Sequence, residues 1–187
     1  NWTNLKPPPP VLITTALAYV NAGWGGDSLK AGLDVKKQLS QQKNAQVTYD
    51  GVITFALQAT KIELRDSTGA LMDSGAVELW TGARWVALGN TSGGRLIVDM
   101  LPGAREFRMT HEGLSQQKKQ DISADPVVVF QTIRVLAEMR DTTGQLVDSG
   151  VVQYYGGSWW TFGTLSGGQA TKEMLPGSYQ FRASFAS

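Results

Sequence analysis

One histidine, two pairs of aspartates and a group of aromatic residues are the side chains of this sequence that could do chemistry. His111 ends the segment REFRMTH, and no nucleophile or acid stands at a spacing that would pair with it. A catalytic histidine needs such a partner within hydrogen-bond reach. The sequence has 0 cysteines, which excludes a thiolate nucleophile and a disulfide framework. We therefore expect a surface histidine at a strand end, no enzymatic activity and no cofactor.

The aspartate pairs invite a comparison with calcium sites. Asp66 with Asp73, and Asp141 with Asp148, could approach one another around a turn and offer carboxylate oxygens to Ca²⁺. The spacing matches no known calcium loop, however, and an aspartate in a turn accepts backbone hydrogen bonds without any ion. The sequence therefore predicts turn-forming aspartates and no metal site.

Aromatic residues gather in corresponding stretches of the two halves of the chain. They are Trp80, Trp85, Tyr154, Tyr155, Trp159 and Trp160. Flat aromatic rows can stack on sugar rings, so a carbohydrate-binding surface is one hypothesis. Alternation along a strand would instead place one of Trp159 and Trp160 in the core and the other outside, where it could pack an interface between consecutive units. The pattern favours a core or interface role, with sugar binding as the alternative.

These residues belong to a repeat that occupies most of the chain. Residues 39–66 match residues 114–141 without a gap, at an offset of 75 (114 − 39). The match continues from RDSTGALMDSGAVELW to RDTTGQLVDSGVVQYY. After the loss of one residue in a turn, MLPGAREFR matches MLPGSYQFR at an offset of 74 (174 − 100). Such self-similarity is the signature of stacked structural units.

Each copy of the repeat has the pattern of β-strands joined by turns. Residues 61–65 and 134–140 end at Asp-Ser-Thr-Gly and Asp-Thr-Thr-Gly, which are turn sequences. The pairs DSGAVELW and DSGVVQYY, ARWVAL and SWWTF, RLIVDM and QATKEM, and REFRMTH and YQFRASF follow, and KKQDIS and PVVVF close the first copy. Short strands at about ten-residue spacing predict a β-sandwich. The predicted fold class is all-β, with two tandem Ig-like or transthyretin-like β-sandwiches, the second lacking its closing strands.

The order of these motifs resembles the transthyretin-like or Cna-B-like (carboxypeptidase regulatory-like) β-sandwich repeats of bacterial surface proteins. The resemblance rests on a strand, Asp-x-x-Gly, a strand of small residues, a Gly-rich turn and Leu-Pro-Gly, and it covers residues 60–187. It implies a stalk, spacer or adhesive module. Some Cna-B domains carry a Lys–Asn isopeptide bond. Here Lys61 has only Arg134 or Val135 near its place in the second copy, and neither closing strand carries an Asn, so this crosslink is not expected.

The repeat divides the chain into four predicted segments. Residues 1–38 form an extended arm with a Pro-rich stretch, and residues 39–59 form a spare pair of closing strands. Residues 60–131 form a complete sandwich. Residues 132–187 form an incomplete one, because Ser187 aligns with Gly113 (187 − 74), just before the LSQQ segment that closes the first copy.

The spare segment LSQQKNAQVTYDGVITFAL is predicted to supply what the second sandwich lacks. Val47, Tyr49, Ile53 and Phe55 alternate within it, apart from the Gly51 position, so that they could share one face and serve as donor-strand contacts. Three arrangements stay open. The segment could close a neighbouring copy and build a head-to-tail filament, it could fold back on its own chain, or the chain could be a fragment of a longer array.

The charge and hydropathy of the sequence argue against nucleic acids and membranes as partners. The net charge is +1 and no Lys/Arg cluster is long enough to follow a phosphate backbone, so no nucleic acid is expected. The longest apolar stretch, VLITTALAYV, is too short to insert across a membrane. The chain starts at Asn1 rather than Met, as a processed or trimmed chain does. We expect a non-enzymatic extracellular or cell-surface protein that polymerises with itself. The alternative is a glycan-binding or adhesive module from a larger repeat protein.

Overall fold

A computed structural model of the chain describes residues 55–185, which form β-strands and turns and no helix. The first seven strands are β1 (Gln58–Arg65), β2 (Ala76–Trp80), β3 (Trp85–Asn90), β4 (Arg95–Met100), β5 (Ala104–His111), β6 (Leu114–Asp121) and β7 (Val127–Gln131). The other five are β8 (Ile133–Glu138), β9 (Val151–Tyr155), β10 (Trp159–Thr164), β11 (Gln169–Met174) and β12 (Phe181–Ser184). The predicted all-β fold class is therefore confirmed.

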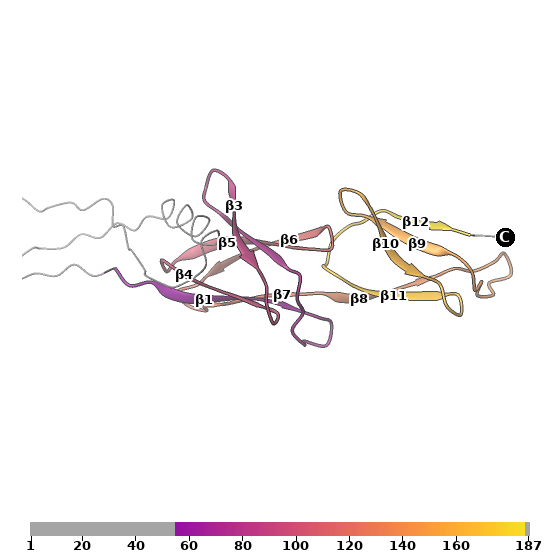
Figure 1. Cartoon of the computed structure of the whole chain (residues 1–187), viewed down its shortest axis with the longest axis horizontal. Helices are drawn as coiled ribbons and strands as arrows, with labels where there is room; N and C mark the ends of the chain where they lie inside the picture. The colour runs from indigo at the N-terminus through magenta and orange to yellow at the C-terminus, as the bar shows by residue number, and fades with distance from the viewer. Residues whose placement is uncertain (1–54, 186–187) are drawn as a thin grey trace, which may run out of the picture.

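Strands β1 to β7 make two sheets, which we refer to together as the N-terminal unit. One sheet has the order β4-β1-β7 and the other has the order β3-β2-β5-β6. β1 is antiparallel to β4 and parallel to β7, whereas all pairs in the other sheet are antiparallel. The two sheets lie in separate layers (Figure 1), as in a β-sandwich.

Alternation of side chains along these strands builds the core of the N-terminal unit. In β5, Phe107, Met109 and His111 are buried, whereas the residues between them are only partly buried. The same period of two is visible in β2 and β7, because successive side chains of a strand point to opposite faces. The fully or almost fully buried apolar residues of this unit are Ile62, Leu64, Val77, Leu79, Met100, Phe107, Met109, Leu114, Ile122, Val128 and Phe130.

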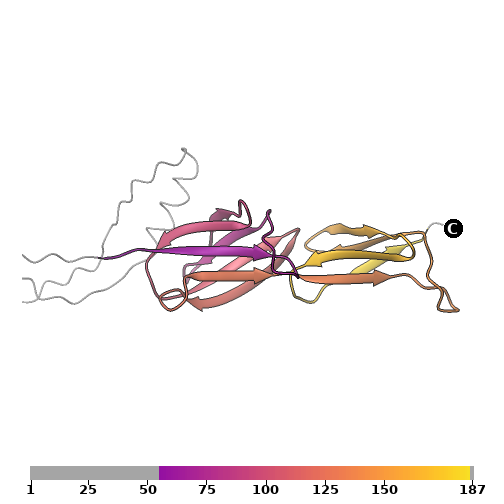
Figure 2. The same cartoon turned by 90° about the horizontal axis from the view of Figure 1, so that it is seen from below.

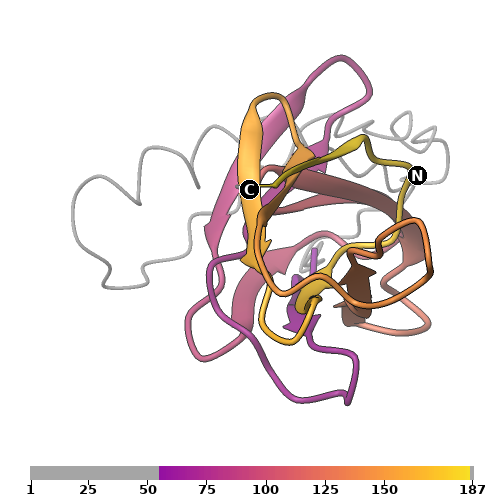
Figure 3. The same ribbon diagram turned by 90° about the vertical axis from the view of Figure 1, so that its right-hand side faces the viewer.

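Strands β8 to β12 make the C-terminal unit, which repeats the N-terminal unit in part. Its sheets have the orders β11-β8 and β10-β9-β12, and these correspond to β4-β1 and β3-β2-β5. Seen end-on, its strands again lie in two layers (Figure 3). Within residues 55–185 it contains no counterpart of β6 or β7.

The two units lie end to end along the long axis of the molecule (Figure 1, Figure 2). β7 and β8 run in the same direction along this axis (Figure 2), and only Thr132 separates them. Thr132 is 1% exposed. A link of one buried residue leaves little freedom between the two units.

Candidate functional site

The candidate site consists of the two edges of the C-terminal unit, β8 and β12, that lack the partner strands found in the N-terminal unit. Among the described residues, β12 pairs only with β9 and β8 pairs only with β11. In the N-terminal unit the corresponding edges are covered, because β6 pairs with β5 at eight positions and β7 pairs with β1 at five. An uncovered edge offers a row of unpaired N–H and C=O groups to another strand.

Apolar side chains are exposed along the β12 edge. Phe181 is 47% exposed, whereas its repeat counterpart Phe107 (181 − 74) is 0% exposed. Phe185 is 55% exposed at the position where the first copy has His111, which is 6% exposed. Phe181 keeps an edge-to-face contact with Phe162, with ring centroids 5.9 Å apart. Phe181 therefore points toward the interior of its unit, as Phe107 does, but no strand among the described residues covers it.

The inner face of β8 is also half-covered. Ala137 and Met139 are only partly buried, whereas their counterparts Ile62 and Leu64 (137 − 75 and 139 − 75) are 0% exposed. On the outer face of β8, at the position of the exposed Lys61, Leu136 is a further apolar side chain of this edge and is 52% exposed. Both edges of the C-terminal unit therefore combine free backbone groups with apolar surface, which is the chemistry of a strand-accepting groove.

The N-terminal unit shows which side chains cover such edges. They are Leu114, Ile122, Val128 and Phe130, each at most 2% exposed. At the offset of 75, the same positions of the spare segment hold Leu39, Val47, Ile53 and Phe55. The sequence of this segment is therefore apolar wherever the closing strands of the first copy touch the core.

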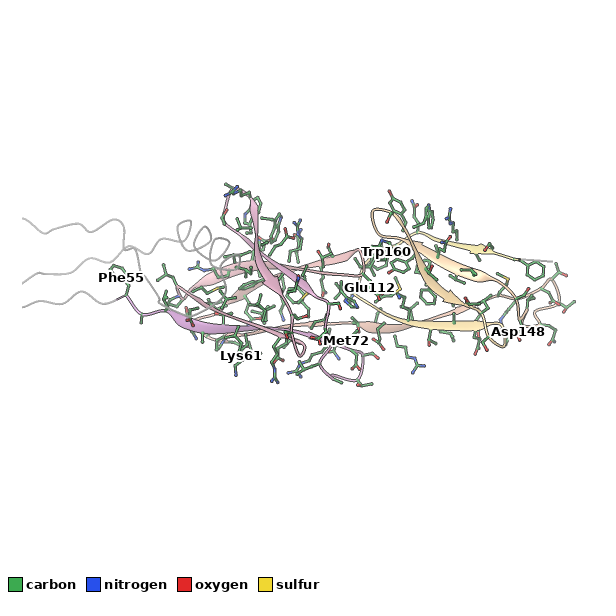
Figure 4. The ribbon with its side chains drawn as sticks, in the orientation of Figure 1. Phe55, Lys61, Met72, Glu112, Asp148 and Trp160 are labelled. Atoms are coloured by element: carbon green, nitrogen blue, oxygen red, sulfur yellow. The ribbon has the colours of Figure 1, made fainter. Side chains whose placement is uncertain are left out.

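The repeat counterparts of the four predicted donor-strand contacts are not all core residues. Val47, Tyr49 and Ile53 lie outside the described residues. Phe55 is half-buried and lies at the end of the molecule opposite the open edges (Figure 4). The counterpart of Tyr49 is Ala124, which is exposed between β6 and β7. The repeat thus assigns core positions to Val47, Ile53 and Phe55 and a turn position to Tyr49.

A cluster of aromatic residues around an arginine lies on the β3-β2-β5-β6 sheet. The rings of Trp80 and Trp85 are cross-strand neighbours with centroids 5.3 Å apart. The Arg108 guanidinium lies 4.6 Å from the centroid of the Trp85 ring, and its Nε donates a hydrogen bond to Glu78 Oε2 at 2.5 Å. Because the carboxylate fixes the guanidinium, the cation–π contact is preorganised. We refer to these four residues as the N-terminal aromatic cluster.

The C-terminal unit repeats this arrangement with one change of chemistry. Tyr155 and Trp159 meet edge to face with centroids 5.5 Å apart, and Arg182 lies 4.2 Å from the centroid of the Trp159 ring. Gln153 replaces the glutamate, and its Oε1 accepts a hydrogen bond from Arg182 Nε at 2.8 Å. We refer to these four residues as the C-terminal aromatic cluster. Two of the predicted sugar or interface aromatics thus lie in each cluster.

Trp160 lies at the joint between the two units. A Cβ atom placed on Gly113, whose φ is +75°, would lie 2.6 Å from Trp160 Nε1, so the indole packs directly on this turn of the N-terminal unit. Trp159 and Trp160 point to opposite faces of the sheet, as alternation predicts, because Trp159 pairs with Tyr155 and Trp160 pairs with the buried Tyr154. Both rings are nevertheless exposed, at 37% and 42%, so neither fills the core. The start of β10 reaches the neighbouring unit, and Tyr154 of β9 supplies the core aromatic ring at 0% exposure.

Polar contacts fix the same side of the joint. The buried Tyr154 hydroxyl donates to the Glu112 carbonyl oxygen at 2.9 Å, and Lys172 Nζ lies 2.7 Å from Glu112 Oε2. Burial raises the pKa of Tyr154 to about 12. Figure 4 shows Trp160 and Glu112 close together where the units meet. The turn between β5 and β6 therefore contacts the C-terminal unit through the aromatic side chains Trp160 and Tyr154 and through the Lys172–Glu112 ion pair.

A carboxylate binds the other side of the joint. Glu173 accepts hydrogen bonds from Ser67 N at 3.0 Å, from Ser67 Oγ at 2.6 Å and from Thr132 Oγ1 at 2.5 Å. Burial raises the pKa of Glu173, but these hydrogen bonds outweigh it and leave the pKa below its usual 4.5. Glu173 therefore ties β11 both to the first turn of the N-terminal unit and to the link residue.

No family model matches this sequence, and no curated protein is similar enough to count as a relative. Among residues 55–185 there is also no helix long and apolar enough to cross a membrane. The geometry of the edges, the clusters and the joint therefore carries the functional argument.

His111 differs from the expectation of a surface residue. It is 6% exposed, and its Nδ1 lies 3.3 Å from the Ser74 carbonyl oxygen. The alternation that buries Phe107 and Met109 continues to His111, so the side chain points inward. The sequence contained this signal, since a period of two from Phe107 reaches residue 111.

The first aspartate of each pair acts in a turn, and the second accepts a hydrogen bond from the backbone N–H of a distant glycine. Asp66 Oδ1 accepts hydrogen bonds from Thr68 N, Thr68 Oγ1 and Ala70 N, and Asp141 makes the same set with Thr143 and Gln145. These bonds, the threonine hydroxyl first, hold the pKa of both aspartates below the usual 3.8. No group of three or more metal-ligating side chains occurs among the residues that the structure describes.

Proposed function

We propose that this chain is a non-enzymatic structural protein of the extracellular space or cell surface, a subunit of a head-to-tail fibre joined by strand donation. Residues 39–57 of one copy close the open C-terminal unit of another. The observation that carries the proposal is the contrast between Phe181, 47% exposed, and Phe107, 0% exposed, at the same position of the repeat. The motifs shared with transthyretin-like and Cna-B-like surface repeats agree with a structural role.

The energy available at this groove suits assembly. Full burial of a side chain such as that of Ile53 contributes roughly 1.5–3 kcal/mol relative to exposure, and completing the burial of the half-buried Phe181, Phe185 and Phe55 contributes about half as much for each. Each backbone hydrogen bond of the new ladders adds about 1 kcal/mol. Association costs roughly 4–15 kcal/mol in lost translational and rotational freedom. The apolar burial alone is of the same order as this cost, and the ladders then favour the joined state.

The size of the particles in solution tests this proposal. The full chain is expected to form polymers whose length grows with protein concentration and that resist mild denaturant, as measured by light scattering. Deletion of residues 1–57 is expected to leave monomers. Deletion of residues 1–38 is the matched control, because it keeps the donor segment and is expected to keep the polymer. A full chain that stays monomeric at all concentrations overturns the proposal.

Sugar binding is a second candidate, and the two aromatic clusters support it. Tyr155 and Trp159 are 45% and 37% exposed, and Arg182 is held beside them. Flat rings with a fixed donor group could recognise a glycan. The substitutions Trp85→Ala and Trp159→Ala are expected to abolish binding on a glycan array and to leave polymer length unchanged. An array without any binding by the parent protein eliminates this candidate.

A further inference from the structure

We infer that the open C-terminal unit accepts residues 39–57 only from a second copy of the chain, and in one register. Residues 52–56 dock parallel to β8, and residues 39–46 dock antiparallel to β12. The inference rests on the proposed function and specifies its partner, polarity and residue pairs.

The parallel half of the register follows from β7. In the N-terminal unit, Lys61 of β1 pairs with Val127 of β7, and Arg65 pairs with Gln131. The offset of 75 carries residues 61 and 65 to 136 and 140. It also brings 127 and 131 back to 52 and 56. The donated strand therefore pairs Val52 with Leu136 and Ala56 with Arg140. This register turns Ile53 and Phe55 toward the core, because their counterparts Val128 and Phe130 face it.

The antiparallel half of the register follows from β6. Thr110 pairs with Ser115, and His111 pairs with Leu114. The offsets of 74 and 75 convert the first of these pairs into Ser184 with Ser40 and the second into Phe185 with Leu39. A shift of one residue would turn the apolar side chains of the donor away from the core, so the register is strongly specified.

The length of β1 excludes donation within one chain. In this register residue 57 lies beside Asp141, just beyond the far end of β8, and the next residue, Gln58, begins β1. β1 and β8 run along the same axis, one unit after the other (Figure 2). The start of β1 and the end of β8 are therefore separated by about sixteen strand residues, or roughly 50 Å. Adjacent Cα atoms are only about 3.8 Å apart, so the donor is a second copy.

Donation by a second copy reproduces the joint that the chain already contains. Residue 57 of the donor takes the place of Thr132, and β1 of the donor follows it as β8 follows β7. The exposed Asp99 of the donor, the counterpart of Glu173 (173 − 74), then faces Thr142 of the acceptor, the counterpart of Ser67. Every junction of the fibre therefore has the same strand path, whether it lies within a chain or between chains.

Engineered cysteines test the register, because the native chain contains 0 cysteines. In the N-terminal unit, Thr110 Oγ1 and Ser115 Oγ are 2.7 Å apart, so their side chains share one face. The counterparts Ser184 and Ser40 are expected to be equally close across the junction. A chain with Ser40→Cys mixed with a chain with Ser184→Cys is expected to give a covalent dimer, by oxidation or with a short bismaleimide. The doubly substituted chain is expected to give a covalent ladder.

Two matched controls sharpen this experiment. Thr110→Cys with Ser115→Cys is expected to crosslink within one chain and to give no ladder. Ser40→Cys with Ala183→Cys places the two thiols on opposite faces and is expected to crosslink at least tenfold less than the in-register pair.

Each outcome of the crosslinking decides something. A crosslinked monomer of the Ser40→Cys, Ser184→Cys chain shows fold-back and overturns the inference. If light scattering detects polymers but no Ser40–Ser184 crosslink forms, the register is wrong, whereas the proposal of a fibre stands. Absence of both polymer and crosslink overturns the inference together with the proposed function.

Discussion

The N-terminal and C-terminal units carry nearly the same motifs and reach different degrees of burial. Val77 and Leu79 of β2 are at most 1% exposed, and their counterparts Val152 and Tyr154 of β9 are at most 5% exposed. The central strand is thus equally well covered in both units. At the edges the burial of the two units differs, since Phe107 is buried and Phe181 is half exposed. The comparison teaches that burial at a repeat position depends on the strands that close the unit as much as on the residue itself.

The largest expected difference between the units is in the stability lost when the repeat counterparts Phe107 and Phe181 are truncated. In a chain without residues 1–57, Phe107→Ala is expected to lower the free energy of unfolding of the N-terminal unit by about 3–5 kcal/mol, because it empties a packed core. Phe181→Ala is expected to cost less than about 1 kcal/mol, because this ring is already half in water. Denaturant unfolding followed by hydrogen exchange separates the two units. Equal losses would show that the C-terminal edge is covered in some other way.

A free peptide should remove the difference between the units. A synthetic peptide with the sequence of residues 39–57, added to the chain lacking residues 1–57, is expected to protect the amides of β8 and β12 from exchange. At a hundredfold excess over its Kd, the peptide stabilises the C-terminal unit by about 2.7 kcal/mol. The same peptide with Ile53→Asp and Phe55→Asp is the control, and it is expected to give no protection. Protection by both peptides would argue against a specific groove.

The first acidic residue of each unit offers a smaller contrast, which depends on pH. Glu63 Oε1 accepts a hydrogen bond from Arg95 Nε at 2.9 Å, Glu63 Oε2 accepts one from Arg65 Nε at 2.9 Å, and the carboxylate side chain is 4% exposed. The hydrogen bond from Arg65 is the main reason that the pKa of Glu63 lies below its usual 4.5. A lowered pKa in the folded state means that the charged form contributes stability above about pH 4.5, which is lost as the pH falls through the folded-state value.

Glu63→Gln is therefore expected to cost about 1–2 kcal/mol at neutral pH and to flatten the acid limb of the stability profile of the N-terminal unit. The counterpart Glu138 is more exposed, at 30%, and pairs with Arg140. Solvent screens that pair, so Glu138→Gln is expected to have a clearly smaller effect. Chemical unfolding at several pH values between 3 and 7, read for each unit by hydrogen exchange, measures both. An unchanged acid limb in the Glu63 variant would contradict the assignment.

The smallest expected effect concerns Glu173, which bonds across the joint, and its repeat counterpart Asp99, which is exposed in the monomer. Glu173→Gln is expected to weaken the attachment of the two units by about 1 kcal/mol, because it replaces charged by neutral hydrogen bonds to Ser67 and Thr132. Asp99→Asn, at the same position of the N-terminal unit, is expected to change nothing in the monomer. Amide exchange at residues 67 and 132 reports the loosening. Equal exchange in both variants would show that the carboxylate of Glu173 does not hold the joint.

The sequence predicts the elements of this fold better than their contacts. The strand positions and the Asp66 and Asp141 turns follow from local chemistry, since alternation and Asp-x-x-Gly act within a few residues. The inward direction of His111 was also readable from Phe107. Glu173 at the joint was not, because its hydrogen bonds depend on how one unit is placed against the next, and no local pattern encodes that placement.

The parallel pairing of β1 with β7 has a mechanical consequence. These are the first and last strands of the N-terminal unit, and they lie side by side over five paired positions. Tension applied at the two ends of the unit therefore shears all of these hydrogen bonds together instead of opening them one at a time. β8 has no such neighbour among the described residues, so under load the C-terminal unit yields first unless a strand is docked beside it.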